Sequence, residues 1–193
     1  MYGSLDIERL GGAMLMTEFG AAEDIKGDLY ALEKSVQQAD KHKQSWMYWQ
    51  FKYFQDITTC TPTGESMYNE DGTPNAHKLR VLSRAYPQAV AGAVDAYHFD
   101  PILSKFTLTY APSTTLPSRT TEIYVNRGLA YRLGAHVSIT ENGSDVAATG
   151  VTVQCTHLNN VIEVIHSPTF AATNVTVTIT PCVPLVTKDC NCL

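Results

Sequence analysis

The sequence predicts two parts of different fold class, an α/β part in residues 1–95 and an antiparallel β-sandwich in residues 96–193. Two observations lead to this division. In the first part, short apolar runs typical of buried parallel strands alternate with segments whose apolar residues recur at helical spacing. In the second part, short runs alternate polar with apolar residues and are separated by Pro, Gly and Asn, which is typical of half-buried antiparallel strands.

The first strand and the first helix of the α/β part follow each other directly. "AMLMTEF" (13–19) is a short, continuous apolar run, which predicts a parallel strand covered on both faces. Residues 21–44 predict a helix, with acids near its start and Lys41, His42 and Lys43 at its end, as the helix dipole favours. One stripe at helical spacing is expected to face inward: Ile25, Leu29, Leu32, Val36 and Ala39.

A second strand and a second helix complete the α/β part. "SWMYWQFKYF" (45–54) is rich in aromatic residues and predicts a strand, and residues 55–74 predict a loop. Asn75 is the expected cap of a helix that runs to about Tyr86, with Pro87 ending or kinking it. Two strand–helix units are too few for a closed (β/α)8 barrel, which needs eight units and about 250 residues, but they fit the last two units of one.

The second part predicts six short strands, which together imply an antiparallel sandwich. In the first of them, Phe106, Leu108 and Tyr110 alternate with Thr and Lys. The six runs are "KFTLTY" (105–110), "TEIYV" (121–125), "AHVSIT" (135–140), "VTVQC" (151–155), "VIEVIH" (161–166) and "NVTVTIT" (174–180).

The composition limits the class of function. A net charge of −5, with 14 Lys and Arg that form no block, argues against a nucleic-acid or anionic-membrane partner, because such partners are bound through clustered cations. No run approaches the roughly 18 consecutive apolar residues of a membrane-spanning helix. The N-terminal sequence "MYGSLDIERLGG" has neither a basic start nor an apolar centre, so it does not read as a signal peptide.

Two other features are nevertheless typical of extracellular proteins. Asn142 and Asn174 begin acceptor sequons for N-glycosylation. Cys182, Cys190 and Cys192 lie close together near the end of the chain, where they could hold a disulfide in an oxidising compartment. A secretory composition without an export signal predicts that a preceding segment is missing from this sequence.

The remaining cysteines and the histidines receive structural interpretations. The odd number of five cysteines leaves at least one thiol free or paired to another chain, and Cys60 is a candidate for a bridge outside this segment. Cys155, inside a strand-like run, is interpreted as a buried apolar group. Scattered histidines lack the spacing of metal ligands, so we expect no metal site and interpret them as surface or hydrogen-bonded residues: His77, His98, His136, His157 and His166.

Four segments of the sequence together resemble the C-terminal part of endoglycoceramidases in glycoside hydrolase family 5. They are "MTEFGA", "SWMYWQFK", "NAHKLRVLSRAYPQAVAG" and "FDPILSKFTLTY". The resemblance extends over nearly the whole chain, with least support before residue 12 and after residue 183. It implies the last two units of a (β/α)8 barrel followed by a β-sandwich, and a hydrolase that needs neither a metal nor an organic cofactor.

The resemblance implies that Glu18 is the catalytic nucleophile, at the end of the seventh barrel strand. The residues support this position independently, because Glu18 follows an apolar run, and chemistry in parallel barrels gathers at the C-terminal ends of the strands. In a retaining glycosidase such a carboxylate forms a covalent glycosyl-enzyme that water later hydrolyses. The alternative is that Glu18 caps the following helix.

The resemblance also implies that Trp49 forms an apolar floor beneath the sugar next to the scissile bond. Strand alternation sends Trp46 and Tyr48 to one side and Trp49 to the other, so Trp46 is interpreted as packing. Gln50 and Lys52 follow directly and are candidates for contact with sugar hydroxyls.

Retaining hydrolysis needs a second carboxyl group roughly 5 Å from the nucleophile, as acid/base. The family places that glutamate after an asparagine at the end of the fourth barrel strand, which this sequence does not contain. Asn69-Glu70 repeats the dipeptide, but it lies in the turn sequence "MYNEDGTP", so Glu70 is interpreted as a solvated loop residue. Since general acid catalysis contributes about two to four orders of magnitude, we expect this chain alone to be inactive.

Two functions of different class follow from the sequence. The first is the C-terminal portion of a retaining hydrolase that cleaves the β-glycosidic bond between glycan and ceramide in glycosphingolipids, or another β-glucoside, secreted or lysosomal in its full-length relative. The second is a non-catalytic product whose sandwich binds or stabilises lipid, carbohydrate or a membrane surface; Tyr124 and Tyr131 are its candidate exposed aromatics. An unrelated sandwich adhesin would leave residues 13–92 unexplained.

Overall fold

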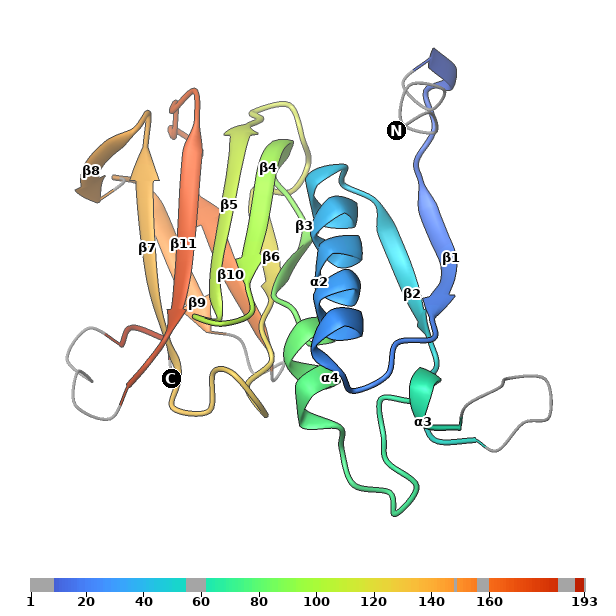
Figure 1. Cartoon of the computed structure of the whole chain (residues 1–193). Coiled ribbons are helices and arrows are strands. Elements are labelled where there is room, and N and C mark those ends of the chain that lie inside the picture. Colours follow the sequence, from blue (N-terminus) through green and yellow to red (C-terminus); the bar gives the residue numbers. More distant parts are fainter. Residues whose placement is uncertain (1–8, 55–61, 148, 156–159, 184–189, 193) are drawn as a thin grey trace. The chain divides into compact units, whose positions relative to one another are not determined.

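The computed structural model describes residues 9–54, 62–147, 149–155, 160–183 and 190–192 (Figure 1). The chain divides into two compact units, Met1–Leu82 and Ser83–Leu193. The predicted boundary between residues 95 and 96 falls inside a strand, β4 (Gly92–Asp100).

The first unit contains a pair of parallel strands and the helix that connects them. β1 (Leu15–Gly20) leads into α2 (Lys26–Lys41), and β2 (Ser45–Trp49) returns parallel to β1. The predicted helix is confirmed, with Asp28 in its first turn and Lys41 in its last. Its inward stripe is confirmed in part: Leu32, Val36 and Ala39 are buried, Leu29 is half-buried, and Ile25 precedes the helix and is exposed.

The second half of this unit holds two short helices, α3 (Pro62–Glu65) and α4 (Ala76–Leu82). Asn75 caps α4 as predicted, because its Oδ1 accepts a hydrogen bond of 3.0 Å from the backbone N–H of Lys78. The prediction that this helix continues to about Tyr86 is wrong. Tyr86 and Pro87 belong instead to a strand, β3 (Tyr86–Ala89), at the edge of a sheet, where the missing N–H of proline is tolerated.

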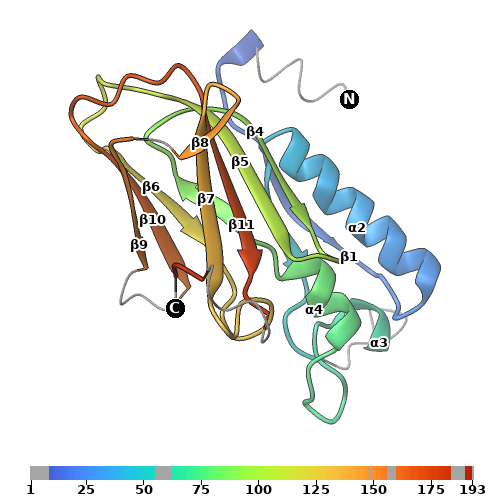
Figure 2. The same cartoon turned by 90° about the vertical axis from the view of Figure 1, so that its left-hand side faces the viewer.

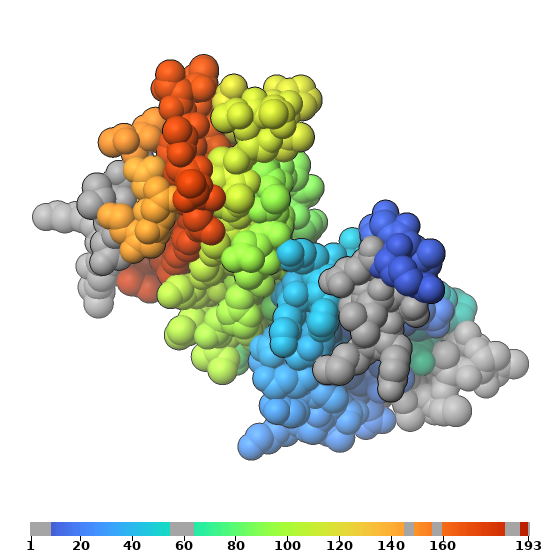
Figure 3. Space-filling view, turned by 90° about the horizontal axis from the view of Figure 1, so that it is seen from above, coloured from blue at the N-terminus to red at the C-terminus, as the bar shows by residue number. Residues whose placement is uncertain are grey.

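The second unit is the predicted sandwich of two antiparallel sheets, which Figure 2 shows as two layers. One sheet has the order β3-β6-β10-β9 and the other the order β4-β5-β11-β7-β8. Figure 3 shows the second sheet as adjacent bands, from orange β7 through red β11 to yellow-green β5. The strands not yet placed are β5 (Lys105–Pro112), β6 (Thr120–Tyr124), β7 (Ala135–Glu141), β8 (Ser144–Ala147), β9 (Val151–Cys155), β10 (Val161–His166) and β11 (Val175–Pro181).

Alternate residues of these strands fill the core between the two sheets. Phe106, Leu108 and Tyr110 of β5 are fully buried, which confirms the alternation predicted for this strand. On β11, Val175 and Val177 are equally buried opposite them. Each such side chain stabilises the fold by about 1.5–3 kcal/mol relative to an exposed one, so this core dominates the stability of the unit.

Two disulfides fasten the C-terminal segment to the sandwich. Cys182 is bonded to Cys190, with Cα atoms 6.0 Å apart, and Cys155 to Cys192, with Cα atoms 5.4 Å apart. The first agrees with the predicted disulfide near the end of the chain. The interpretation of Cys155 as a buried apolar group is wrong, because its strand, β9, brings it next to the C-terminal segment. Cys60 lies outside the described residues.

None of the helices in the described ranges is long and apolar enough to cross a membrane.

Candidate active site at the ends of the parallel strands

The two parallel strands of the first unit end side by side. β1 and β2 pair in parallel, and the last residue of each, Gly20 and Trp49, are partners in the register. Glu18, two residues before Gly20, therefore lies near the same edge of the sheet as Trp49. An antiparallel pairing would have put the two at opposite edges.

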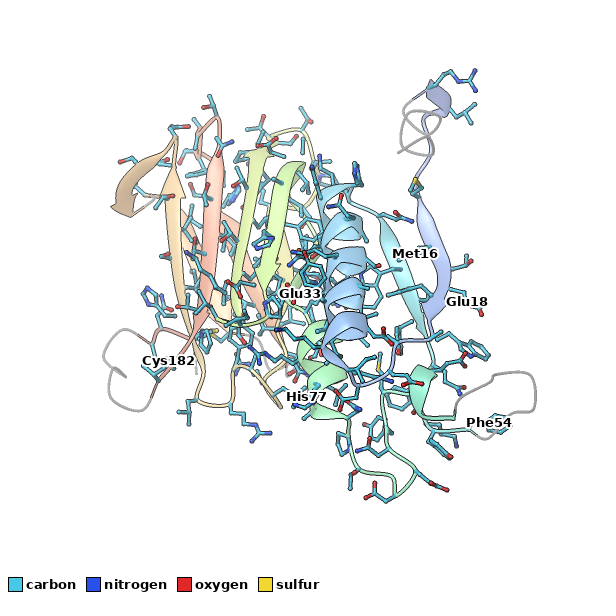
Figure 4. All side chains as sticks on the ribbon, in the orientation of Figure 1. Met16, Glu18, Glu33, Phe54, His77 and Cys182 are labelled. Carbon is cyan, nitrogen blue, oxygen red and sulfur yellow. A yellow bond between two sulfur atoms is a disulfide. The ribbon has the colours of Figure 1, made fainter. Side chains whose placement is uncertain are left out.

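A register irregularity in β1 determines what surrounds Glu18. Met16 is opposite Trp46 and Phe19 is opposite Tyr48, so Thr17 and Glu18 together face the single residue between those two partners. With regular pairing, Glu18 rather than Phe19 would be the partner of Tyr48. The irregularity thus keeps the carboxylate out of the packed side of the strand. Glu18 is exposed, and Figure 4 shows it projecting from β1 away from α2.

The aromatic residues of β2 divide between two faces, as predicted. Trp46 and Tyr48 are half-buried and pack edge-on against Phe19, with ring centroids 5.5 Å apart in each pair. Trp49 lies on the other face and is 46% exposed, as is Met47 at 53%. The face opposite α2 is therefore apolar and open, and it carries the candidate sugar platform.

The backbone that follows Trp49 is held on both sides by one short segment. The N–H of Gln50 donates to the carbonyl of Glu65 (2.8 Å), and the carbonyl of Gln50 accepts from the N–H of Met67 (3.0 Å). Gln50 is half-buried, whereas Lys52 is exposed. Their contacts with sugar hydroxyls stay a prediction.

A buried lysine donates hydrogen bonds to the segment that brackets Gln50. Lys78 of α4 is fully buried, and its Nζ donates to the carbonyls of Gly64 and Ser66, at 3.1 Å each. Burial lowers the pKa of this ammonium, and the carboxylates of Asp24 and its acidic neighbours act in the opposite direction. Because residues 65–67 bracket Gln50, Lys78 contributes to fixing the end of β2. Sequence patterns do not predict this role, since a lysine in a short helix is expected to be solvated.

The N-terminus of α4 contacts the loop that follows β1. Asp24, between β1 and α2, lies 2.8 Å from Nδ1 of His77 and accepts a 3.4 Å hydrogen bond from the amide of Asn75. Asn75 also donates its backbone N–H to the carbonyl of Met67 (2.9 Å). The start of α4 thus connects the segments behind both strand ends. The sequence predicted Asn75 only as a helix cap.

Tyr48 and Glu65 each bury a polar side-chain atom near the end of β2. The Tyr48 hydroxyl and Oε2 of Glu65 are buried, and neither has a hydrogen-bond partner among the described residues. Burial, and in second place the negative charge of Glu65, raises the pKa of Tyr48 to about 12. Tyr48 is therefore a neutral packing residue at physiological pH.

Glu70 lies in the exposed turn that the sequence predicted. Tyr68 and Pro74 form an isolated antiparallel bridge, and the N–H of Gly72 donates to the carbonyl of Asn69 (3.0 Å) within the turn. Glu70 is exposed there.

The two sequon asparagines of the sandwich lie side by side. Asn142, in the turn between β7 and β8, donates its N–H to the carbonyl of Asn174 (3.0 Å). Its Oδ1 accepts from the N–H of Asn174 (3.2 Å) and from the hydroxyl of Thr173 (2.7 Å). Asn142 is exposed and Asn174 is half-buried. Their glycosylation stays a prediction.

One hollow in the described surface lies beside Asn142 and is lined by residues of the second unit. It has a volume of about 570 Å³ and is open to solvent. Of the predicted site residues it contains Asn142 alone. It therefore offers no support to the candidate active site.

Comparison with known proteins places the chain in a family. The model of the glycoside hydrolase family 5 C-terminal domain matches residues 84–180. The endoglycoceramidase of Cyanea nozakii is 33% identical over 138 residues, which cover 69% of this chain and 27% of that protein. The endoglycoceramidase of Hydra vulgaris is 31% identical over 140 residues, which cover 72% of this chain and 26% of that protein. The chain therefore spans about a quarter of the length of these relatives.

A solved structure has the same fold. Endo-glycoceramidase II from Rhodococcus sp. superposes with a TM-score of 0.67 and 23% identity, over 93% of this chain and 36% of that one. One structure of that enzyme is a complex with ganglioside GM3. The chain belongs to glycoside hydrolase family 5 and resembles the C-terminal part of the endoglycoceramidases of that family.

Proposed function

We propose that this chain is the C-terminal portion of a retaining glycoside hydrolase that cleaves the β-glycosidic bond between glycan and ceramide. In this proposal β1 and β2 are the last two strands of a (β/α)8 barrel. One observation carries it: the strands are parallel, and Glu18 and Trp49 lie near the edge where both end. That edge is where barrel enzymes carry their chemistry. The names of the relatives supply the substrate class.

Glu18 is the nucleophile in this proposal. Its carboxylate attacks the anomeric carbon, a carbon–oxygen bond to Glu18 forms, and the bond to the ceramide oxygen breaks. The departing oxygen takes a proton from a second carboxylic acid. Glu70, exposed in its turn, is a poor candidate for that acid. We therefore propose that the chain by itself is inactive and that the acid/base comes from an upstream barrel strand.

Trp49 is the platform for the sugar. Its indole lies on the open face of β2, and an aromatic face stacks on the apolar face of a pyranose. Gln50 and Lys52 are proposed to hydrogen-bond sugar hydroxyls at the same edge.

A chimera tests the proposal. Residues 13–193 would replace the corresponding C-terminal region of the Cyanea nozakii endoglycoceramidase, and release of oligosaccharide from a fluorescent glycolipid would be measured. We expect the chimera to be active and Glu18→Gln to lower its rate by at least about 10³-fold, whereas the matched variant Glu70→Gln leaves the rate unchanged. Full activity of the Glu18→Gln chimera would contradict the proposal.

Covalent trapping identifies the nucleophile independently of the acid/base residue. A 2-fluoroglycosyl fluoride needs no protonation of its leaving group, so it should label Glu18 in the chimera even when the acid/base is removed. Peptide mass spectrometry would locate the adduct. An adduct on any other carboxylate would overturn the assignment.

We also propose that the protein matures in the secretory pathway. The two disulfides and the two sequon asparagines on the sandwich surface support this, since disulfides persist in oxidising compartments.

The alternative of a lipid-binding sandwich loses the aromatic residues on which it rested. Tyr131 is buried, and its hydroxyl donates to the carbonyl of Ser104 (2.7 Å). Tyr124 is half-buried and stacks on Tyr86, with ring centroids 5.1 Å apart. The prediction that these two tyrosines are exposed is wrong, because Tyr131 belongs to the core of the sandwich and Tyr124 stacks on Tyr86 of the neighbouring strand.

A further inference from the structure

Exposed aliphatic side chains of the second unit gather at one end of the sandwich. β5 and β7 run in the same direction, since both pair antiparallel with β11. The turns that precede them, residues 101–104 and 126–134, therefore lie at the same end of the sheet, together with the residues that follow β11. Figure 1 shows this end at the bottom of the sandwich. We call it the apolar end, after its exposed side chains Ile102, Leu103, Leu129, Leu133 and Val183.

The exposure of these residues is high and local. Ile102 is 72% exposed, Leu103 63% and Leu133 51%. Elsewhere in the described part of the second unit, the exposed large apolar residues are Tyr86 and Leu116. An apolar side chain exposed singly needs no explanation, but several on adjacent turns are typical of a binding surface.

Hydrogen bonds hold the apolar side chains outward. Oδ1 of Asp100 accepts from the N–H groups of Ile102 (2.7 Å) and Leu103 (3.0 Å), which fixes the turn. The hydroxyl of buried Tyr131 donates to the carbonyl of Ser104 and so ties the second turn to the first. The exposure is therefore a property of the folded turns.

Cationic residues lie on or next to these turns, although the chain as a whole carries a net charge of −5. Lys105 and Arg132 are exposed, and Arg127 is half-buried. Asp100, the last residue of β4, is the cross-strand partner of Lys105, and its carboxylate accepts the two backbone hydrogen bonds just described. Apolar tips between cations complement the interface of an anionic bilayer, where apolar side chains enter the boundary of the acyl chains and cations contact phosphate.

We propose that the apolar end is a membrane-docking surface, which inserts Ile102, Leu103, Leu129 and Leu133 into a lipid interface while Lys105 and Arg132 contact anionic headgroups. This inference goes beyond the proposed hydrolase, because it uses no residue of the candidate active site and requires no glycolipid.

Co-sedimentation of the full chain with vesicles tests it. The vesicles contain phosphatidylcholine with about one third phosphatidylserine and no glycolipid, so that apolar insertion and attraction to anionic headgroups can both contribute to binding. We expect the double change Ile102→Ser and Leu103→Ser to weaken partitioning at least about tenfold, since it removes two aliphatic side chains from the interface. The matched control Leu116→Ser alters an exposed leucine in the loop after β5, at the opposite end, and should leave partitioning unchanged.

The contribution of charge is tested separately. Lys105→Glu should weaken binding to the anionic vesicles, whereas Lys26→Glu, at an exposed position in the first unit with the same change of net charge, should not. Circular dichroism of each variant verifies that it is folded.

Fluorescence locates the insertion directly. Leu103→Trp is expected to give a vesicle-dependent blue shift and quenching by brominated lipids, relative to the unaltered chain. Leu116→Trp, the control at the other end, should give neither.

Three outcomes would overturn the proposal. They are failure of the unaltered chain to bind vesicles, an equal loss of binding in Leu116→Ser, and loss of lipid-free self-association in the Ile102/Leu103 variant, which would assign the surface to a second copy of the chain. None of them bears on Glu18, because the vesicles contain no glycosidic substrate.

Discussion

Lys78 carries a positive charge into the interior of the first unit, where it satisfies two backbone carbonyls. Replacing it by methionine, an unbranched apolar side chain one atom shorter, leaves the carbonyls of Gly64 and Ser66 without this donor. We expect Lys78→Met to lower the free energy of unfolding by about 2–4 kcal/mol. Urea denaturation followed by tryptophan fluorescence measures this, because both tryptophans are on β2.

Lys26→Met is the matched control for this change. Lys26 is exposed at the start of α2, so its replacement should change the free energy by less than about 0.5 kcal/mol. Equal midpoints for the two variants would show that the buried ammonium is dispensable.

His166 makes the stability of the sandwich depend on pH. It is 5% exposed, and its Nε2 lies 2.6 Å from the hydroxyl of Tyr110. Burial, and in second place the charge of Arg119, lowers the pKa of His166 below its usual 6.5. Between that lowered pKa and 6.5, the unfolded chain binds more protons than the native one, so stability rises with pH.

We therefore expect the His166 contribution to be complete above about pH 6.5 and to be lost as the pH falls toward the lowered pKa, with a slope of at most about 1.4 kcal/mol per pH unit. Thermal melts at pH 7, 6 and 5 would be compared with those of His166→Gln, which should show a smaller decline. His98→Gln, at an exposed position of β4, should decline as the unaltered chain does. Parallel declines in all three proteins would refute the assignment.

At the scale of elements, the contact between the ends of β1 and β2 depends on a glycine. A Cβ on Gly20 would collide with the carbonyl oxygen of Trp49. We expect Gly20→Ala to destabilise the first unit by about 1–3 kcal/mol and to shift the tryptophan emission, because the strand ends must separate.

Gly27→Ala provides the comparison. A Cβ on Gly27, in α2, meets nothing within 4 Å, so stability should stay unchanged or rise by up to about 1 kcal/mol. The interpretation of Gly20 would be wrong if the two alanine variants unfolded at the same denaturant concentration.

Elements whose apolar residues follow a clear pattern could be predicted from the sequence. The apolar run of β1, the stripe of α2 and the alternation of β5 each identified an element that the structure contains. The boundary predicted between residues 95 and 96 falls inside β4, because pairing with β5 overrides the low strand preference of Gly92 and Asp100. The helix predicted to run to about Tyr86 ends at Leu82, because Tyr86 and Pro87 pair with β6 at the edge of a sheet, where proline is tolerated.

The strand patterns predict that Glu18 and Trp49 lie near strand ends, as they do in the structure, whereas their roles are what the resemblance implies and stay predictions. The contacts that support these two strand ends could not be predicted. The register irregularity that keeps Glu18 off the helix side depends on the pairing of two segments far apart in the chain, and no single-strand pattern encodes it. The same holds for Lys78, whose partners belong to another loop.

At the scale of the whole molecule, the two units differ in how much apolar surface they bury. The first unit has a small core around Leu32 and Val36 and a two-stranded sheet with one open apolar face. The second has an extensive core between two sheets, and two disulfides. We expect unfolding in two steps, with the first unit opening at a lower concentration of urea.

Hydrogen exchange measured by mass spectrometry at increasing urea tests this expectation. Peptides from β1 and β2 should lose protection before peptides from β5, β10 and β11. Coincident loss of protection in all of them would mean that the chain unfolds as one cooperative unit.

Because of the disulfide between Cys155 and Cys192, the two ends of this chain should differ in their sensitivity to exopeptidases. Ala135 and Cys192 exchange both backbone hydrogen bonds, and the disulfide adds a covalent attachment at the same residue. A carboxypeptidase should stall at Cys192 until a reductant opens the bond, whereas an aminopeptidase meets no disulfide in residues 9–54 and is slowed there by folding alone. Intact-mass measurements over time, with and without reductant, would reveal this asymmetry as redox-dependent digestion from one end only.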